Sequence, residues 1–400
     1  MDRYLRQPGA AAIFDRYVDD IVFCDTARSD DLWEAVESAH RKKPLTAFMS
    51  MAEYEVVDAA LVAERLQVPG PARQAVLTAR NKVFMRQACA AAKLPMPEFR
   101  AVASAAAAAD AARQLGFPCV VKPADETSSA LVRRCHSVEQ AVEQYVAITS
   151  EPLNIRGQPR YPEVLVEECI IGYEVSVEVL AERGRYVVLG VTDKQLGGTD
   201  RFVELGHLFP SMLPQLVQRA AEALAVDALT AVGFDLGLAH VEIKHGNGGP
   251  KLIEVNPRPA GDRITDLVTL SLGIDCLELV VRQYLGRPLG PLPGIHASRG
   301  AAIRFLTAPP GEVQAVMGRD VAERVDGVVD AVVSVGPGDL VGALLRNEDR
   351  VGHVLAVGET AYVASRVAEA AAHEIVVATR RAAGQPDESR PQDDRLESAA

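Results

Sequence analysis

The stretch Gly233–Arg263, GFDLGLAHVEIKHGNGGPKLIEVNPRPAGDR, decides the fold that this sequence predicts. HVEIK predicts a strand, HGNGGP a turn and KLIEVN a returning strand. Because side chains on a strand alternate between its two faces, Glu254 and Asn256 point the same way. A hairpin centred near Gly248 then sets Glu242 opposite Glu254, with their Cβ atoms ~5 Å apart.

Two facing carboxylates repel each other unless a proton or a cation resolves the repulsion. Carboxylate and amide oxygens are hard ligands, which suit Mg2+ that carries substrate phosphates. The sequence therefore predicts a metal site made of Glu242, Glu254 and Asn256. The alternative is a surface hairpin with two solvated glutamates. The trio together with Pro257-Arg258-Pro259, which follows it, favours the metal site.

The composition is that of a globular protein with two or three domains, since the chain has 400 residues of which 48% are hydrophobic. A formal net charge of −12 argues against a nucleic-acid partner. No segment predicts a signal peptide or a membrane span, so we expect a cytoplasmic protein. Six scattered cysteines without a CxxC pair predict reduced thiols, and Cys119 and Cys169 are predicted to be inert core residues.

Residues 1–75 predict a small Rossmann-like domain. DDIVFCD (19–25) and PLTAFMS (44–50) have the apolar character of buried parallel strands, and DDLWEAVESAHR (30–41) that of a crossover helix. The segment has no GxGxxG, and its first recognisable strand comes only near Ile21, so we expect a domain that is shortened at its N-terminus.

The rest of the chain predicts alternating helices and strands of α/β character. The expected helices are 72–92, 104–115 with Gly116 as its stop, 137–149 with Ser137 as its N-cap, 211–230 and 274–285. The expected strands before the metal hairpin are 117–123, 163–170, 172–180 and 185–194. Gly290–Gly294 predicts a linker into a last α/β unit at 291–380, and the polar residues 381–400 predict a disordered tail.

Candidate phosphate-binding groups precede the metal hairpin. Lys122 ends the strand FPCVVK among apolar residues, whereas Lys82 follows Asn81 within a predicted helix and, taken alone, is better explained as a solvated surface lysine. Ser128 and Ser129 follow Lys122 in a loop whose backbone N–H groups could wrap a phosphate. The loop lacks glycine, so an ordinary Ser/Thr turn is an equal alternative.

The segment 166–178 joins two strands through Gly172, and its second strand has one acidic and one apolar face. Glu174, Ser176 and Glu178 share the acidic face, which could hold ribose hydroxyls. A half-exposed antiparallel strand is the alternative.

Four motifs in this order, NK (81–82), VVKP (120–123), VEECIIGYEVSVE (166–178) and HVEIK…LIEVNPRP (240–259), together resemble the ATP-grasp superfamily. The match runs from about residue 72 to 290. The resemblance implies ATP between two α+β subdomains, with an ATP-grasp domain at 76–290 and a lid within about 105–180. It also implies activation of a carboxylate as an acyl phosphate, which an amine then attacks.

The resemblance also implies roles for individual residues. Lys82 and Lys122 resemble the two lysines that bind ATP phosphates, and Arg258 resembles the arginine that meets the transferred phosphate or a substrate carboxylate. The remaining matches are the hinge against adenine at Glu167, Glu168 and Ile170, the ribose-binding Glu174, and the magnesium ligands Glu242 and Glu254 beside Asn256. The chain departs from the pattern in its glycine-free loop 124–130, which puts the phosphate-binding role of that loop in doubt.

A narrower resemblance lies at TDKQLGGTDRFVELGHLFPS (192–211), which is similar to a pattern in L-amino-acid ligases. It implies that Glu204 and His207 shape an amino-acid pocket, where Glu204 would bind an ammonium and His207 a carboxylate or oxyanion. A structural role is the alternative for His207. Lys194 contacts the γ-phosphate or is a solvated loop charge, and Gly197 and Gly198 let the loop close.

The sequence thus predicts an ATP-dependent carboxylate–amine ligase that joins two amino acids, with Arg258, Lys122 and His207 as catalytic residues. The expected cofactors are ATP and Mg2+, with Mn2+ as a substitute. The expected partners are small molecules, with no nucleic acid and no membrane, and a homodimer is left open. The alternatives are an ATP-grasp enzyme of formyl or carboxy transfer to a nucleotide precursor, a catalytically silent ATP-binding protein, and a biosynthetic ligase for an unusual acid or amine.

Overall fold

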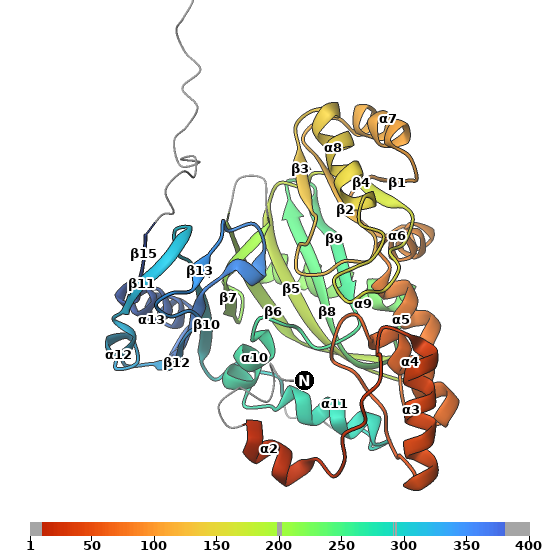
Figure 1. The fold of residues 1–400 in the computed structure, drawn as a ribbon, viewed down its shortest axis with the longest axis horizontal. Helices are drawn as coiled ribbons and strands as arrows, with labels where there is room; N and C mark the ends of the chain where they lie inside the picture. The colour runs from red at the N-terminus through yellow and green to blue at the C-terminus, as the bar shows by residue number, and fades with distance from the viewer. Residues whose placement is uncertain (1–9, 198–201, 291, 293, 381–400) are drawn as a thin grey trace, which may run out of the picture.

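An eight-stranded antiparallel sheet forms the centre of the molecule (Figure 1). This computed structural model describes residues 10–197, 202–290, 292 and 294–380, so Gly198 of the predicted closing loop, part of the predicted linker and the predicted tail lie outside the described residues. The strand order is β12-β14-β10-β7-β6-β5-β8-β9. In chain order the strands are β5 Tyr173–Glu182, β6 Arg185–Gly197, β7 Val203–Phe209, β8 Leu236–Gly246, β9 Gly249–Asn256, β10 Gly300–Leu306, β12 Val328–Val333 and β14 Gly352–Gly358.

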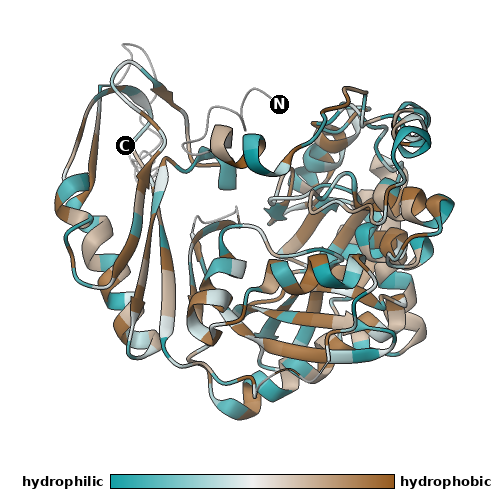
Figure 2. Cartoon of the chain, turned by 90° about the horizontal axis from the view of Figure 1, so that it is seen from below, coloured by the Kyte–Doolittle hydropathy of each residue, from teal (hydrophilic) through white to brown (hydrophobic). Residues whose placement is uncertain are grey.

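Apolar helices cover parts of both faces of the central sheet. Valines of β5 at 175, 177 and 179 pack with helix α9, and residues of β5 to β8 on the other face pack with α10 and α11. Figure 2 shows the matching hydropathy, with apolar colour on the strands and polar colour on outward turns of the helices. The helices are α9 Gln215–Val232, α10 Ile264–Leu272 and α11 Cys276–Tyr284. No described helix is both long and apolar enough to cross a membrane.

A four-stranded sheet with two helices forms the lid subdomain above one end of the central sheet (Figure 1). Its strand order is β1-β4-β2-β3, and its own core lies between this sheet and the helices. The predicted cap Ser137 and the predicted stop at Gly116 are confirmed, and Ser104, predicted as the first residue of its helix, is the N-cap of α7. The elements are β1 Phe99–Val102, α7 Ala105–Leu115, β2 Cys119–Pro123, β3 Arg133–Cys135, α8 Val138–Thr149 and β4 Val164–Glu168, so β5 belongs to the central sheet and not to the lid.

The last α/β unit continues the central sheet, since three of its strands pair there. Only β11, β13 and β15 form a separate sheet, and helix α13 packs on β10 and β14. The elements are β11 Gly311–Met317, α12 Arg319–Ala322, β13 Leu340–Val341, the short helix η1 Asn347–Asp349, α13 Ala361–Glu374 and β15 Val376–Arg380.

The N-terminal prediction is wrong in one respect, because residues 10–75 as described contain no strand. The predicted crossover helix is present, but segments 19–25 and 44–50 are not part of a sheet. A parallel strand is stable only when it pairs with a neighbour, and in this region no neighbouring strand is described. Phe23 is accordingly 77% exposed. The helices are α2 Ala10–Tyr17, α3 Ser29–Lys42 and α4 Val56–Leu66.

The helix predicted over 72–92 is two helices, α5 Arg73–Arg80 and α6 Lys82–Ala91. Asn81 is extended, with φ −91° and ψ 113°, and its side chain accepts hydrogen bonds from the N–H groups of Val83 and Phe84. This N-cap competes with a continuous helix. It places Lys82 in the first turn of α6, where its N–H donates to the Ala124 carbonyl at the start of the loop 124–130.

Candidate active site

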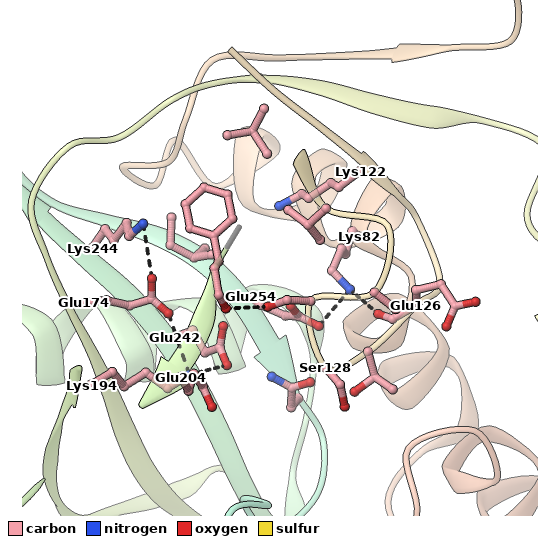
Figure 3. A pocket seen from close by; sticks show the side chains of 18 of the residues that line it. Lys82, Lys122, Glu126, Ser128, Glu174, Lys194, Glu204, Glu242, Lys244 and Glu254 are labelled. Carbon is pink, nitrogen blue, oxygen red and sulfur yellow. Dashed lines mark hydrogen bonds and ion pairs between the residues drawn. The ribbon is translucent and has the colours of Figure 1, made fainter. Parts of the chain in front are cut away.

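A cleft between the lid and the central sheet contains nearly every predicted site residue (Figure 3). His207 alone among them does not line it. The residues that do are Lys82, Lys122, Ser128, Ser129, Glu167, Glu168, Ile170, Glu174, Lys194, Glu204, Glu242, Glu254, Asn256 and Arg258.

Glu242 and Glu254 face each other on β8 and β9, as the sequence predicts. Each carboxylate has an ammonium partner: Lys194 Nζ lies 2.6 Å from Glu242 Oε1, and Lys82 Nζ lies 2.8 Å from Glu254 Oε1. Burial acts to raise the pKa of Glu242, but the charges of Lys194 and His240 hold it well below its usual range. A carboxylate held in its charged form attracts cations, as a magnesium site requires.

Lys194 is buried among three carboxylates of the central sheet (Figure 3). Its Nζ lies 2.6 Å from Glu204, 2.6 Å from Glu242 and 3.7 Å from Glu174. Burial opposes its charge, yet these carboxylates raise its pKa well above the usual value. The expectation of a solvated loop lysine is thus excluded by its burial and contacts.

A series of charged contacts runs from Glu242 through His240 to Glu178 within the sheet. His240 Nε2 lies 3.2 Å from Glu242, and its Nδ1 lies 2.9 Å from the buried Glu178, which also accepts from Ser176 Oγ. Despite burial, the Glu178 charge raises the pKa of His240 to about 9. A protonated His240 fixes the orientation of the Glu242 carboxylate from behind.

The side of the cleft that the sequence predicts to bind adenine and ribose contains further ion pairs. Glu174 contacts Lys244 at 3.2 Å as well as Lys194, and burial raises its pKa. Glu168 pairs with Lys251 at 2.7 Å near the surface. Cys169 is partly exposed and lines the cleft, so the prediction of an inert core position is wrong for it, whereas Cys119 is buried.

The glycine-free loop 124–130 adopts the left-handed backbone conformation that glycine usually supplies. Ser128 and Ser129 have φ of 55° and 57°, and consecutive or alternating residues of this kind turn backbone N–H groups towards one side. The Ser129 hydroxyl donates to the Phe202 carbonyl at 3.1 Å, which connects the loop to the opposite wall of the cleft. Both serines line the cleft.

Beyond Lys194 lies a group of three side chains, Glu204, His207 and Asp262, that together could hold a metal ion. His207 Nε2 lies 3.5 Å from Glu204 and 3.7 Å from Asp262, which are ion-pair distances. Arg350 also binds Asp262 through two hydrogen bonds of 2.7 and 2.9 Å. Lys194 contacts Glu204 and Arg350 contacts Asp262, so each carboxylate of this group has a cationic partner, as Glu242 and Glu254 also have.

His207 does not line the cleft, and its fully buried side chain packs edge-on against Phe305. Its predicted contact with substrate stays a prediction. The side chain lies behind Glu204 and Asp262, which are its ion-pair partners. Both raise its pKa against the effect of burial.

Replacing His207 by Gln should remove a pH-dependent part of the stability. Because the folded-state pKa is raised from 6.5, the contribution of charged His207 is fully present below that pH and is lost as the pH rises through the folded pKa. The difference in unfolding free energy between wild type and His207→Gln should shrink in urea titrations as the pH rises above about 6.5. A difference that stays constant would contradict a charged His207.

Arg258 lies at the cleft and is held by a short ion pair with Glu53, which follows the predicted strand segment 44–50. Glu53 also binds Arg80 at 3.1 Å. The N-terminal region thus contributes to the site through a carboxylate that sequence reasoning missed.

Other participants were missed for identifiable reasons. Strand periodicity could have shown that His240 and Lys244 share a face with Glu242, since the three residues are spaced two apart along β8. Arg350 and Glu53 reach the site from segments about 90 and 205 residues away in sequence from their partners Asp262 and Arg258, and no local pattern predicts such contacts.

Comparison with known proteins agrees with this geometry. Residues 115–266 match the family model of the ATP-grasp domain, and residues 304–380 match L-amino acid ligase C-terminal domain 2. A D-alanine–D-alanine ligase of Verminephrobacter eiseniae is 30% identical over 236 residues, which cover 54% of this chain and 67% of that protein. The chain belongs to the ATP-grasp superfamily. It is accordingly an ATP-grasp ligase that forms C–N bonds, of the carboxylate–amine type and similar to L-amino acid ligases.

Two further similarities extend over most of the chain. The crystal structure of L-amino acid ligase from Bacillus licheniformis superposes with a TM-score of 0.76 at 21% identity, covering 88% of this chain and 86% of that one. An uncharacterised protein y4rH of Sinorhizobium fredii is 28% identical over 355 residues, which cover 88% of this chain and 72% of that protein. The first likeness confirms the fold predicted for this ATP-grasp ligase.

Proposed function

We propose that this ligase activates the carboxyl group of one amino acid with ATP and joins it to the amino group of a second. The observation that carries the proposal is the position of Lys194. Its ammonium joins the facing pair Glu242 and Glu254, through Glu242, to the Glu204–Asp262 group in one continuous cleft. Phosphate chemistry and an acidic pocket for an ammonium group are thus adjacent. The match to an L-amino acid ligase C-terminal domain supports amino acids as substrates.

The metal-binding residues of the proposal are Glu242, Glu254 and Asn256, and the donor set fits Mg2+ with Mn2+ as a substitute. Glu242 and Glu254 would hold the metal, which would supply positive charge to the phosphates of ATP. Lys194 contacts Glu242 and Lys82 contacts Glu254, so we assign both ammonium groups to the same phosphate-binding end of the cleft.

The remaining roles concern the other parts of ATP. We assign Lys122 and Arg258 to the transferred phosphoryl group, whose charge they neutralise. We assign Ser128 and Ser129, with their loop, to the phosphates. Residues 167–170 would contact the adenine. Glu174 would bind the ribose hydroxyls in place of its contacts with Lys194 and Lys244. Positioning and charge dominate, because phosphoryl transfer needs little covalent help from a protein.

The reaction then has two steps. An oxygen of the substrate carboxylate attacks the γ-phosphorus, ADP leaves, and an acyl phosphate forms. The amino group of the second substrate, bound at Glu204 as an ammonium, gives one proton to that carboxylate and attacks the acyl carbon as the neutral amine. The C–O bond to phosphate breaks and the leaving phosphate takes the second N–H proton, while His207 acts from behind Glu204 as a positioning residue. The lid excludes water from the acyl phosphate.

Phosphate release over a matrix of amino-acid pairs, with mass analysis of the products, tests this function. We expect ATP-dependent phosphate release only when at least one amino acid is present, and a product whose mass equals two amino acids minus water. The match to formate-dependent phosphoribosylglycinamide formyltransferase of Salmonella paratyphi B, 28% identical over 245 residues, makes formyl transfer the second candidate. Phosphate release with formate and a ribonucleotide amine, but with no amino acid, would favour it. A cytoplasmic location and a homodimer stay predictions.

A further inference from the structure

Arg86 on α6 is one of the largest side chains with no solvent exposure, and the proposed function gives it no role. A guanidinium is buried at a large free-energy penalty unless every donor has a partner. Its partners come from two different subdomains, the lid and the central sheet.

On the lid side, Arg86 binds the carboxylate of Glu167 with two hydrogen bonds of 2.7 and 3.2 Å. The same carboxylate binds Lys122 Nζ at 2.7 Å. Glu167 is 3% exposed at its side chain, so solvent does not weaken these contacts. Arg86 therefore fixes the group that holds the proposed phosphate lysine Lys122.

On the sheet side, Arg86 donates to the backbone carbonyls of Leu252 at 3.0 Å and Ile253 at 2.9 Å. These residues immediately precede Glu254. They lie on β9, the edge strand of the central sheet, whose outer side also donates from Leu252 N–H to the Pro95 carbonyl. The Arg86 side chain and the Pro95 carbonyl thus form the hydrogen bonds that an adjacent strand would form with β9.

The two carbonyls mark a β-bulge. Ile243 pairs with Leu252, but Glu242 pairs with Glu254, so Ile253 is an extra residue without a partner on β8. In a regular ladder continued from Ile243, Glu242 would face Ile253, and Glu254 would point to the opposite face of the sheet. The extra residue is what lets both Ile253 and Glu254 line the cleft.

We propose that Arg86 is a positioning residue that holds the bulge at Ile253, keeps Glu254 facing Glu242, and through Glu167 keeps Lys122 in place. The inference rests on the proposed metal role of Glu254. Lysine cannot reproduce it, because a single ammonium lacks the planar fork that reaches a carboxylate and two carbonyls at once.

The test compares ATP binding with and without Mg2+ in Arg86→Lys and in Val83→Ala, a control in which a buried core side chain of the same helix is shortened. We expect Arg86→Lys to weaken ATP binding in Mg2+ by about tenfold or more and binding without Mg2+ by less than about threefold, since its charge beside Glu167 is kept. Val83→Ala should lower Tm to a similar extent and leave the ratio of the two affinities unchanged. If Arg86→Lys does not fold, Arg86→Gln is measured in the same way, since it leaves Glu167 paired with Lys122.

The variant Glu254→Gln tests the metal role of Glu254 separately from the positioning role of Arg86. If it abolishes the Mg2+ effect on ATP binding while Arg86→Lys or Arg86→Gln behaves like Val83→Ala, the role of Arg86 is refuted and the metal site stands. If Glu254→Gln keeps the full Mg2+ effect, the metal assignment fails and the role of Arg86 fails with it. Loss of the effect in both the Glu254 and the Arg86 variants supports the proposal.

Discussion

Replacing Glu254 or Glu242 by Gln should lower amino-acid-dependent phosphate release by about a thousandfold or more, which corresponds to about 4 kcal/mol of barrier. Glutamine keeps the size and one oxygen of the side chain but removes the negative charge. The two carboxylates face each other across β8 and β9, so loss of either leaves a single anionic ligand. The measurement is the rate of phosphate release at saturating ATP and Mg2+.

Folding and chemistry are distinguished by a matched control. Glu222→Gln makes the same chemical change on α9, outside the cleft, and should keep wild-type activity. Urea unfolding should show Glu254→Gln folded, since Lys82 retains a hydrogen bond to the Glu126 carbonyl at 2.7 Å. Near-normal ligation by either variant would reject the metal assignment.

Replacing Lys194 by Met should abolish activity and also destabilise the fold. The side chain of Lys194 is 1% exposed and contacts the carboxylates of Glu174, Glu204 and Glu242. Breaking a buried ion pair from one side typically costs about 3–5 kcal/mol, because a charge is left without compensation. We expect unfolding free energy to fall by that order in urea titrations and phosphate release to become undetectable.

Lys251→Met is the control for Lys194→Met. Lys251 pairs with Glu168, whose side chain is 41% exposed, and exposed pairs contribute about 0–1 kcal/mol. It should therefore leave stability nearly unchanged. A Lys194→Met protein as stable as Lys251→Met, and still active, would show that the three carboxylates do not depend on this ammonium.

The central hairpin shows how far sequence reasoning reaches. Alternation and a hairpin centred near Gly248 predict that Glu242 faces Glu254, and the structure confirms the pair. The register of the hairpin arises differently from the prediction. Gly246 pairs with Gly249, so the turn is centred half a residue before Gly248. The extra residue Ile253 in the bulge then brings Glu254 opposite Glu242. Periodicity predicts which residues share a strand face, but a bulge depends on a tertiary contact such as that of Arg86.

Long-range pairing accounts for most of what sequence reasoning did not predict. The cap at Ser137 is local and was predicted, since a side-chain hydrogen bond to a nearby N–H needs no partner elsewhere. Segments 19–25 and 44–50 have the composition of strands but no ladder partner, and β10 joins the central sheet through β7. Which strand pairs with which is set by tertiary packing and not by local composition.

Crystals grown with a non-hydrolysable ATP analogue and Mn2+ would test the central claim most directly. Anomalous scattering locates manganese independently of the protein model-building. The account predicts a manganese peak contacted by carboxylate oxygens of both Glu242 and Glu254 and by the analogue's phosphates, with the lysines moved to phosphate oxygens. Manganese bound elsewhere, or a nucleotide whose phosphates lie away from these two side chains, would contradict it.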